Sequence, residues 1–172
     1  MNKILAAARF ARLAHQGKKR KYTGEPFITH PSRVAGRVLL HEAACENMVC
    51  AAFLHDVVED THFTFDHLMS RFGKGVVRLC QELTNPSKDS DALRPERKAM
   101  DREHIKGISR EAKIIKLYDR IDNVNDMAGA ADDFKKLYCE ESRLLAEALK
   151  DASETLYDEL IEAVERLEKT CK

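Results

Sequence analysis

The side chains best suited to chemistry lie in the stretch LHDVVEDT at positions 54–61. His55 stands beside Asp56, and Glu59 and Asp60 follow one helical turn later. The apolar residues before them predict a buried helix, in which carboxylates are costly to desolvate unless something pairs with them. On a continuous helix, the i to i+4 spacing lays His55 over Glu59 and Asp56 over Asp60. A bound cation would remove the cost, although a His-Asp pair at a helix end is more often a charged helix end or a satisfied core pair.

Two further residues strengthen the metal interpretation. His30 lies upstream, where a helix is expected to begin, and Asp119 lies downstream in KLYDRIDN at 116–123. Together they predict a ligand set of two imidazoles and two carboxylates, namely His30, His55, Asp56 and Asp119. This mixture of nitrogen and oxygen suits Mn²⁺, Fe²⁺ or Zn²⁺ better than Mg²⁺ or Ca²⁺, and Mn²⁺ is the expected ion.

The order His, His-Asp, Asp resembles that of the HD metal-dependent phosphohydrolase superfamily, and further motifs narrow the resemblance. In chain order they are AHQGKKRKYTGEPFITHP at 14–31, LHDVVEDT at 54–61, RFG at 71–73, ELT at 82–84 and KLYDRIDN at 116–123. The set, which covers the chain from about Ile4 to Asn123, resembles small stand-alone RelA/SpoT-type (p)ppGpp 3′-pyrophosphohydrolases. The resemblance implies an all-α HD-domain helical bundle that hydrolyses the 3′-pyrophosphate of this alarmone, giving GDP or GTP plus pyrophosphate.

The resemblance also implies roles for individual residues. Glu59 and Asp60 are the catalytic dyad, which would orient and deprotonate the attacking water. Arg20 and Lys21, before the turn at 24–26, match a pair that contacts the guanine base. Arginine can in addition stack on a purine and donate to its edge.

Two more residues are candidates for substrate binding. Asn123 lies one helical turn beyond Asp119, so it is expected to face the same cavity and to hold the ribose or the 3′-phosphate. Tyr138, on the following helix, either lines the nucleotide pocket or simply packs between helices.

Four positions depart from the pattern usual in the resembling proteins. Lys18 stands where Gln is frequent, Phe27 where Tyr is frequent, Tyr118 where a small residue is common, and Asp122 where His is frequent. None of them removes a predicted ligand or a member of the dyad. They bear on base selectivity and on the shape of the pocket.

Length, charge and cysteine usage agree with a single cytoplasmic domain over 1–172. A chain of this length can bury a full core, but has no room for the synthetase and regulatory domains of long RelA/SpoT proteins. The formal charge is zero, yet residues 1–40 carry nine Lys or Arg against Glu25 alone, which favours a compact anionic ligand. The sequence has no long basic stripe of the kind that predicts nucleic-acid binding. It also has no apolar run long enough to predict a membrane-spanning helix. The cysteine spacing favours reduced thiols.

Helix signals occur along the whole chain. Asn2 can cap a first helix that ends near Gly17, Thr64 can begin a short helix closed by Gly73, and Pro95 can open one that reaches about Lys106. A single helix is expected to carry the His-Asp motif, Ser109 is expected to cap the helix of Asp119, and Asp151 with Glu154 suggests a capping box. A short hairpin within 17–29 is compatible with the sequence.

Two alternatives to alarmone hydrolysis remain. Another HD phosphohydrolase, acting on ordinary nucleotides or on NADPH, would share the metal chemistry and differ only in pocket contacts. A catalytically idle nucleotide-binding module would keep the nucleotide pocket but not the catalytic activity. The pair Arg20-Lys21 argues against the first alternative, and retention of both Glu59 and Asp60 argues against the second.

Overall fold

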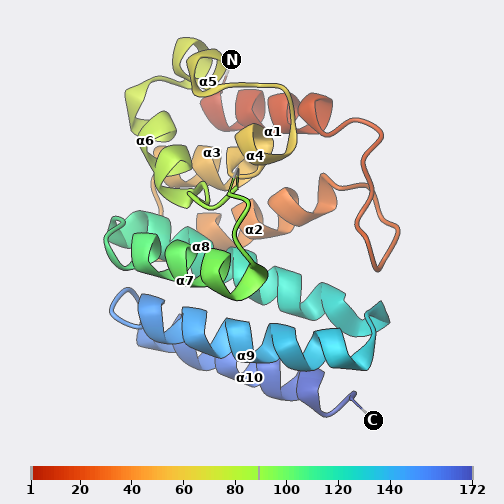
Figure 1. Cartoon of the computed structure of the whole chain (residues 1–172). Helices are drawn as coiled ribbons and strands as arrows, with labels where there is room; N and C mark the ends of the chain where they lie inside the picture. Colours follow the sequence, from red (N-terminus) through yellow and green to blue (C-terminus); the bar gives the residue numbers. More distant parts are fainter. Residues whose placement is uncertain (1, 89, 172) are drawn as a thin grey trace.

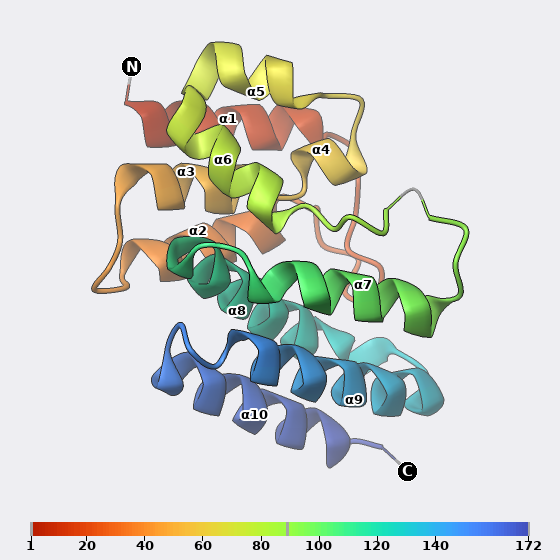
Figure 2. The ribbon, with the colours of Figure 1, turned by 60° about the vertical axis from the view of Figure 1, so that its left-hand side comes forward.

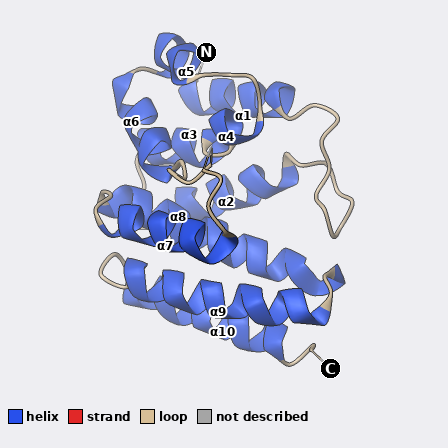
Figure 3. Cartoon of the chain, in the orientation of Figure 1, coloured by secondary structure: helices blue, strands red, loops and turns tan. Residues whose placement is uncertain are grey.

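The computed structural model describes residues 2–88 and 90–171, and within these ranges the chain forms helices and no strand (Figure 3). The expected all-α bundle is confirmed within these ranges. In order, the helices are α1 (Lys3–Ala14), α2 (Thr29–Leu39), α3 (Glu46–Leu54), α4 (Val57–Asp60), α5 (Phe65–Phe72), α6 (Lys74–Leu83), α7 (Arg94–Lys106), α8 (Arg110–Asn125), the 3₁₀ turn η1 (Asp126–Gly129), α9 (Asp132–Leu149) and α10 (Glu154–Glu168). None of the described helices is long and apolar enough to cross a membrane.

Most helix ends follow local capping rules. The Asn2 side chain accepts hydrogen bonds from the amides of Ile4 and Leu5, and Ser109 accepts one from Ala112. Thr64 caps α5, which Gly73 ends with a φ of 78°. These side chains satisfy amides that have no partner inside the helix.

The expected capping box of Asp151 and Glu154 is wrong. The side chain of Ser153 caps α10 by accepting from the amide of Leu156, while Asp151 instead pairs with Lys113, whose Nζ lies 2.7 Å from its Oδ2. Serine and aspartate are about equally good N-caps, so local preference alone does not choose between them.

The prediction that a single helix carries the His-Asp motif is also wrong. Helix α3 ends at Leu54, His55 and Asp56 form a turn, and the short α4 begins at Val57. The four polar side chains of the motif therefore do not lie on two adjoining strips of one helix. His55 and Asp56 lie beside His30 and Asp119, whereas Glu59 contacts Asn85 and Asp60 contacts Lys18.

Helix α8 runs through the middle of the molecule (Figures 1 and 2). It packs against α2 and α3 on one side and against α9 and α10 on the other, while α1 and α5 lie at the end away from α10. Ile114, Ile115, Leu117 and Ile121 of α8 are fully buried. The buried ionisable side chains of this helix, among them Lys116, Asp119 and Asp122, therefore need charged or hydrogen-bonding partners.

The segment between α1 and α2 forms an arm that projects from the helices (Figure 1). A lone antiparallel bridge joins Lys19 to Pro26, the Arg20 amide donates to the Glu25 carbonyl at 2.8 Å, and Gly24 turns the chain with a φ of 72°. The hairpin suggested by the sequence is thus reduced to one bridge, and the arm carries Arg20 and Lys21.

Candidate active site

Four side chains from three parts of the sequence converge on one point. The Nε2 atom of His30, on α2, lies 3.5 Å from Asp56 and 3.2 Å from Asp119, which α8 supplies. The Nε2 atom of His55 lies 3.2 Å from Asp56 and 3.7 Å from Asp119. Ligand atoms of His30, His55 and Asp56 fall within 4.8 Å of one another, the spread of a metal-binding cluster. The four ligands proposed from the sequence are therefore brought together.

The hydrogen bonds of both imidazoles leave the inward nitrogen free to bind a metal. The Nδ1 atom of His30 lies 2.7 Å from Asp122 Oδ2, and the Nδ1 atom of His55 lies 2.8 Å from the carbonyl oxygen of Ala52. Since both of these partners accept, each Nδ1 carries a proton, and in the neutral imidazole each Nε2 presents a lone pair. The Nε2 atom of His55 is buried without a hydrogen-bond partner. These residues fit a divalent metal.

The electrostatics of the cluster also favour a positive charge at its centre. Burial would lower the pKa of His30 and His55, but neighbouring carboxylates outweigh it and raise the pKa of both. Burial would raise the pKa of Asp56, but His55 and His30 hold that pKa at about 2. The carboxylates of the partly buried Asp56 and the buried Asp119 therefore stay ionised, and a cation between them would relieve their repulsion.

Lys116 is a charged neighbour that the motif analysis missed. Its Nζ lies 3.1 Å from Asp119 Oδ2, and both side chains are buried. Burial raises the pKa of Asp119, but Lys116 and the two histidines more than offset it and hold that pKa well below its usual range. The spacing of three residues on α8 was the signal that could have found Lys116, because i and i+3 share a helix face.

The proposed dyad is held by two different sets of partners. Glu59 accepts from the backbone amide of Asn85 at 2.5 Å and from the Asn85 side chain at 3.3 Å, and burial raises its pKa. Asp60 is exposed, with Oδ2 3.6 Å from Lys18 Nζ, and Lys18 also donates to the Asp60 carbonyl oxygen. Only Glu59 has a partly desolvated carboxylate.

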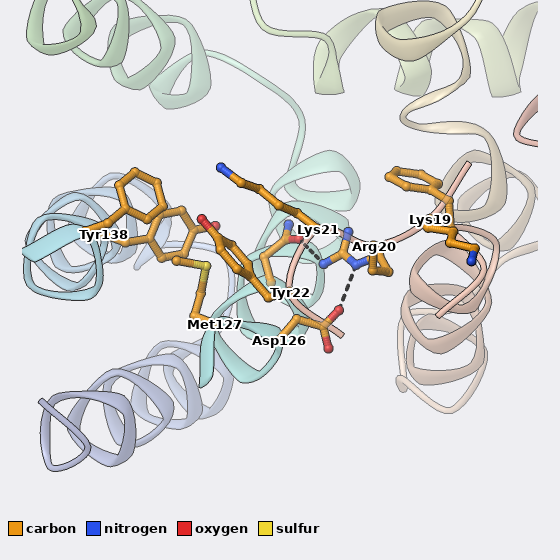
Figure 4. Close-up of a pocket in the computed structure, with 10 residues that line it drawn as sticks. Lys19, Arg20, Lys21, Tyr22, Asp126, Met127 and Tyr138 are labelled. Atoms are coloured by element: carbon orange, nitrogen blue, oxygen red, sulfur yellow. Dashed lines mark hydrogen bonds and ion pairs between the residues drawn. The ribbon is translucent and has the colours of Figure 1, made fainter. Parts of the chain in front are cut away.

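A cavity of about 330 Å³ lies beside the cluster, and all four substrate-binding residues proposed from the sequence line it (Figure 4). Arg20 Nη2 donates to Asn123 Oδ1 at 2.7 Å, and Arg20 Nε donates to Asp126 Oδ2 at 2.7 Å. Asn123 Nδ2 in turn donates to Asp119 Oδ1 at 2.5 Å. Asn123 therefore joins the cavity to the cluster of candidate metal ligands. The lining consists of Lys19, Arg20, Lys21, Tyr22, Phe27, Asn123, Asp126, Met127, Phe134 and Tyr138.

The apolar walls of this cavity were largely missed by sequence reasoning. The Lys21 ammonium lies 5.2 Å from the ring centre of Tyr22 and 5.9 Å from that of Phe134, and the Arg20 guanidinium lies 5.6 Å from the ring of Phe27. Phe134 and Tyr138 are four residues apart on α9, a spacing that places both on one helix face. Flat rings beside cationic groups suit a nucleobase.

Comparison with known proteins agrees with this arrangement. A family model described as HD domain matches residues 7–145. The chain is 41% identical over 127 residues to the Homo sapiens protein guanosine-3′,5′-bis(diphosphate) 3′-pyrophosphohydrolase MESH1, covering 72% of this chain and 69% of that protein. The chain is 39% identical over 127 residues to the Xenopus tropicalis MESH1, which again covers 72% of this chain and 69% of that protein.

A solved structure also resembles the whole chain. It belongs to a metazoan ortholog of SpoT described as hydrolysing ppGpp and playing a role in starvation responses. The two structures superpose with a TM-score of 0.85 at 29% identity, over 96% of each chain. A structure from Listeria monocytogenes matches with a TM-score of 0.65 at 26% identity, over 81% of this chain and 99% of the other.

Proposed function

The chain belongs to the HD domain family, and on that premise we propose that it is a metal-dependent 3′-pyrophosphohydrolase of guanosine 3′,5′-bis(diphosphate). The products are GDP and pyrophosphate, or GTP and pyrophosphate from the pentaphosphate. The observation that carries the proposal is the bridge through Asn123, which contacts Arg20 on one side and Asp119 on the other. A nucleotide whose base lies beside Arg20 would therefore present its phosphates to the metal cluster.

We assign His30, His55, Asp56 and Asp119 as the metal ligands and Mn²⁺ as the native ion, with Fe²⁺ or Zn²⁺ as substitutes. Two imidazole nitrogens with two carboxylates form a mixed donor set of the kind these ions accept. When bound, the ion would lower the pKa of water and polarise a phosphoryl oxygen. Lys116 offsets part of the carboxylate charge and keeps Asp119 ionised for binding.

Glu59 is the proposed proton acceptor. Water attacks the phosphorus attached to the ribose 3′-oxygen, Glu59 takes a proton from that water, and the bond from phosphorus to the 3′-oxygen breaks as the oxygen is protonated. Burial raises the pKa of Glu59, which moves its basicity toward neutral pH. Asp60 is the second member of the dyad, and its exposed position suits a role in orienting water at the mouth of the site.

Arg20, Lys21 and Tyr138 are proposed to bind the nucleotide, with Asn123 at the ribose or 3′-phosphate. The cationic groups of Arg20 and Lys21 lie beside aromatic rings, so a guanine can both stack and accept hydrogen bonds there. The proposed setting is the cytoplasm, which the free thiols of the buried Cys50 and Cys80 favour.

The direct test is an assay of the purified protein with Mn²⁺ on a panel of nucleotides. The panel includes ppGpp, pppGpp, GTP, GDP and NADPH, and released pyrophosphate and phosphate are measured separately. We expect pyrophosphate with GDP from ppGpp, and no comparable turnover of GDP or NADPH. Release of phosphate from NADPH or GTP without cleavage of ppGpp would contradict the proposal.

Two variants separate chemistry from binding in the same assay. Glu59→Gln with Asp60→Asn keeps shape but removes charge, so turnover should fall by about 10²-fold or more while ppGpp still binds. Arg20→Ala should instead raise KM more than it lowers kcat, because Arg20 contacts the base and not the breaking bond. Turnover within a few-fold of the parent in the double variant would show that the dyad is not the base.

A further inference from the structure

A buried carboxylate outside the proposed ligand set contacts the outer nitrogen of a ligand. Asp122 Oδ2 lies 2.7 Å from His30 Nδ1, and the two side chains are 8% and 1% exposed. Arg33 donates to the same carboxylate through Nε, 2.6 Å from Oδ1, and through Nη2, 3.0 Å from Oδ2. The Asp122 carboxylate therefore holds the His30 imidazole at its outer nitrogen. A bidentate ion pair with Arg33 in turn holds the carboxylate.

The same guanidinium reaches the nucleotide cavity. Arg33 Nη2 donates to Asp126 Oδ2 at 2.9 Å, and Arg20 Nε donates to that oxygen at 2.7 Å. Arg20 also contacts Asn123, and Asn123 contacts Asp119. The hydrogen bonds therefore connect Asp122 through the cavity to a second proposed metal ligand, Asp119. The resulting ring is made of His30, Asp122, Arg33, Asp126, Arg20, Asn123 and Asp119.

The chemistry of such a contact is well defined. A histidine that donates its outer N–H to a carboxylate is held in one tautomer and one ring orientation, and its inner nitrogen becomes a better electron donor to a metal. A buried carboxylate without a counter-charge would be too costly to keep for this purpose. Arg33 removes that cost, because its planar fork matches the carboxylate.

We propose that Asp122 and Arg33 are positioning residues for His30, and that together they set the affinity of the site for a divalent transition metal. The inference rests on the proposed function only in taking His30 as a ligand. The competing interpretation is that Arg33 and Asp122 merely tie α2 to α8. That interpretation predicts a loss of stability in the variants without a change in metal affinity.

The test is a titration with Co²⁺ alone, without nucleotide, followed by visible absorption. Asp122→Asn nearly preserves shape and leaves an amide oxygen that can accept from His30, but it lacks the charge. We expect about 10- to 100-fold weaker Co²⁺ binding. Asp122→Ala should bind still more weakly and shift the absorption bands, because the imidazole loses its fixed orientation. Arg33→Gln should weaken binding in the same direction.

The matched control is Arg37→Gln. Arg37 lies one turn further along α2, and its guanidinium pairs with Glu159 of α10 and lies 4.6 Å from the ring centre of Tyr118. This variant should lose a comparable ion pair and keep the parent's affinity and spectrum. Melting of each metal-free variant establishes that it is folded, and should Asp122→Ala not fold, Asp122→Asn decides.

Three results would overturn the inference. The first is Co²⁺ affinity within threefold of the parent in Asp122→Asn and Arg33→Gln. The second is an equal loss of affinity in Arg37→Gln. The third is a parent protein that does not bind Co²⁺. Because no nucleotide is present, a failure here is separate from a failure of the nucleotide assay, which tests the substrate.

Discussion

At the scale of single residues, Glu59 shows how function and stability oppose each other in this protein. Its carboxylate is partly buried, it accepts from the amide of Asn85, and burial raises its pKa. A raised pKa means that the charged form is less favourable in the folded protein than in the unfolded chain. The charge that Glu59 needs for its proposed role as general base is therefore held at a cost to the fold.

We expect Glu59→Gln to melt at a higher temperature than the parent at neutral pH, both proteins being free of metal. Gln keeps an oxygen that can accept from Asn85 and removes the charge. The cost of the charge is absent below the ordinary pKa of Glu, grows between that pKa and the raised pKa of the folded protein, and is fully present above it. The difference in melting temperature between the two proteins should therefore vanish in acid. Melting from acidic to neutral pH measures it, at about 2–4 °C per kcal/mol.

The exposed Asp60 provides the control for this measurement. Asp60→Asn removes a surface pair with Lys18, which contributes little to stability, and should leave the melting temperature nearly unchanged. A Glu59→Gln variant that melts below the parent at neutral pH would contradict the account of Glu59.

At the scale of elements, α8 and the arm between α1 and α2 position their functional side chains in different ways. Helix α8 is buried on most sides, and it carries Lys116, Asp119 and Asp122 three residues apart, each with an oppositely charged partner. The backbone of the arm is shaped by one bridge and by the turn at Gly24, and its Arg20 side chain pairs with Asp126 and Asn123. Asp119, the proposed metal ligand on α8, is therefore placed by a buried helix, while the backbone of Arg20 is placed by a turn.

Alanine at two glycines should distinguish the arm from the helix. Gly24 has a φ of 72°, so Gly24→Ala should cost about 1–2 kcal/mol and raise KM for ppGpp by displacing Arg20. Gly36 is exposed in α2 with nothing within 4 Å of an added Cβ, so Gly36→Ala should stabilise by about 0.5–1 kcal/mol with unchanged KM. Denaturant unfolding and steady-state kinetics measure both. Equal effects at the two sites would refute this distinction.

At the scale of the whole molecule, the ligand cluster joins distant parts of the chain. His30 comes from α2, His55 and Asp56 from the turn between α3 and α4, and Asp119 from α8. A metal bound by the folded protein and not by the unfolded chain stabilises the fold by mass action. Metal content and stability should therefore change together.

Adding Mn²⁺ at about 100 times its dissociation constant should contribute about 2.7 kcal/mol and raise the melting temperature by about 5–10 °C. His55→Ala and Asp56→Asn should lose this rise, together with bound metal and turnover, because each removes a ligand. Calorimetry and elemental analysis measure the two effects. Full metal content in either variant would refute the ligand assignment.

The sequence by itself determined the features that depend on near neighbours. Asn2 and Ser109 cap helices and Thr64 stands at the start of α5, as predicted, because these signals are completed within four residues. The motif order also predicted the helical HD-type fold and the residues that meet in the cluster. Their roles in metal binding and catalysis stay predictions.

Only the tertiary structure decided how these residues are held. The helix break at His55 and Asp56 places Glu59 against Asn85 and Asp60 against Lys18, which the spacing within the motif did not indicate. The Arg33–Asp122 pair joins residues 89 positions apart, and the Arg20–Asp126 pair joins residues 106 apart. Contacts over such separations leave no local pattern, because they depend on which helix faces pack together.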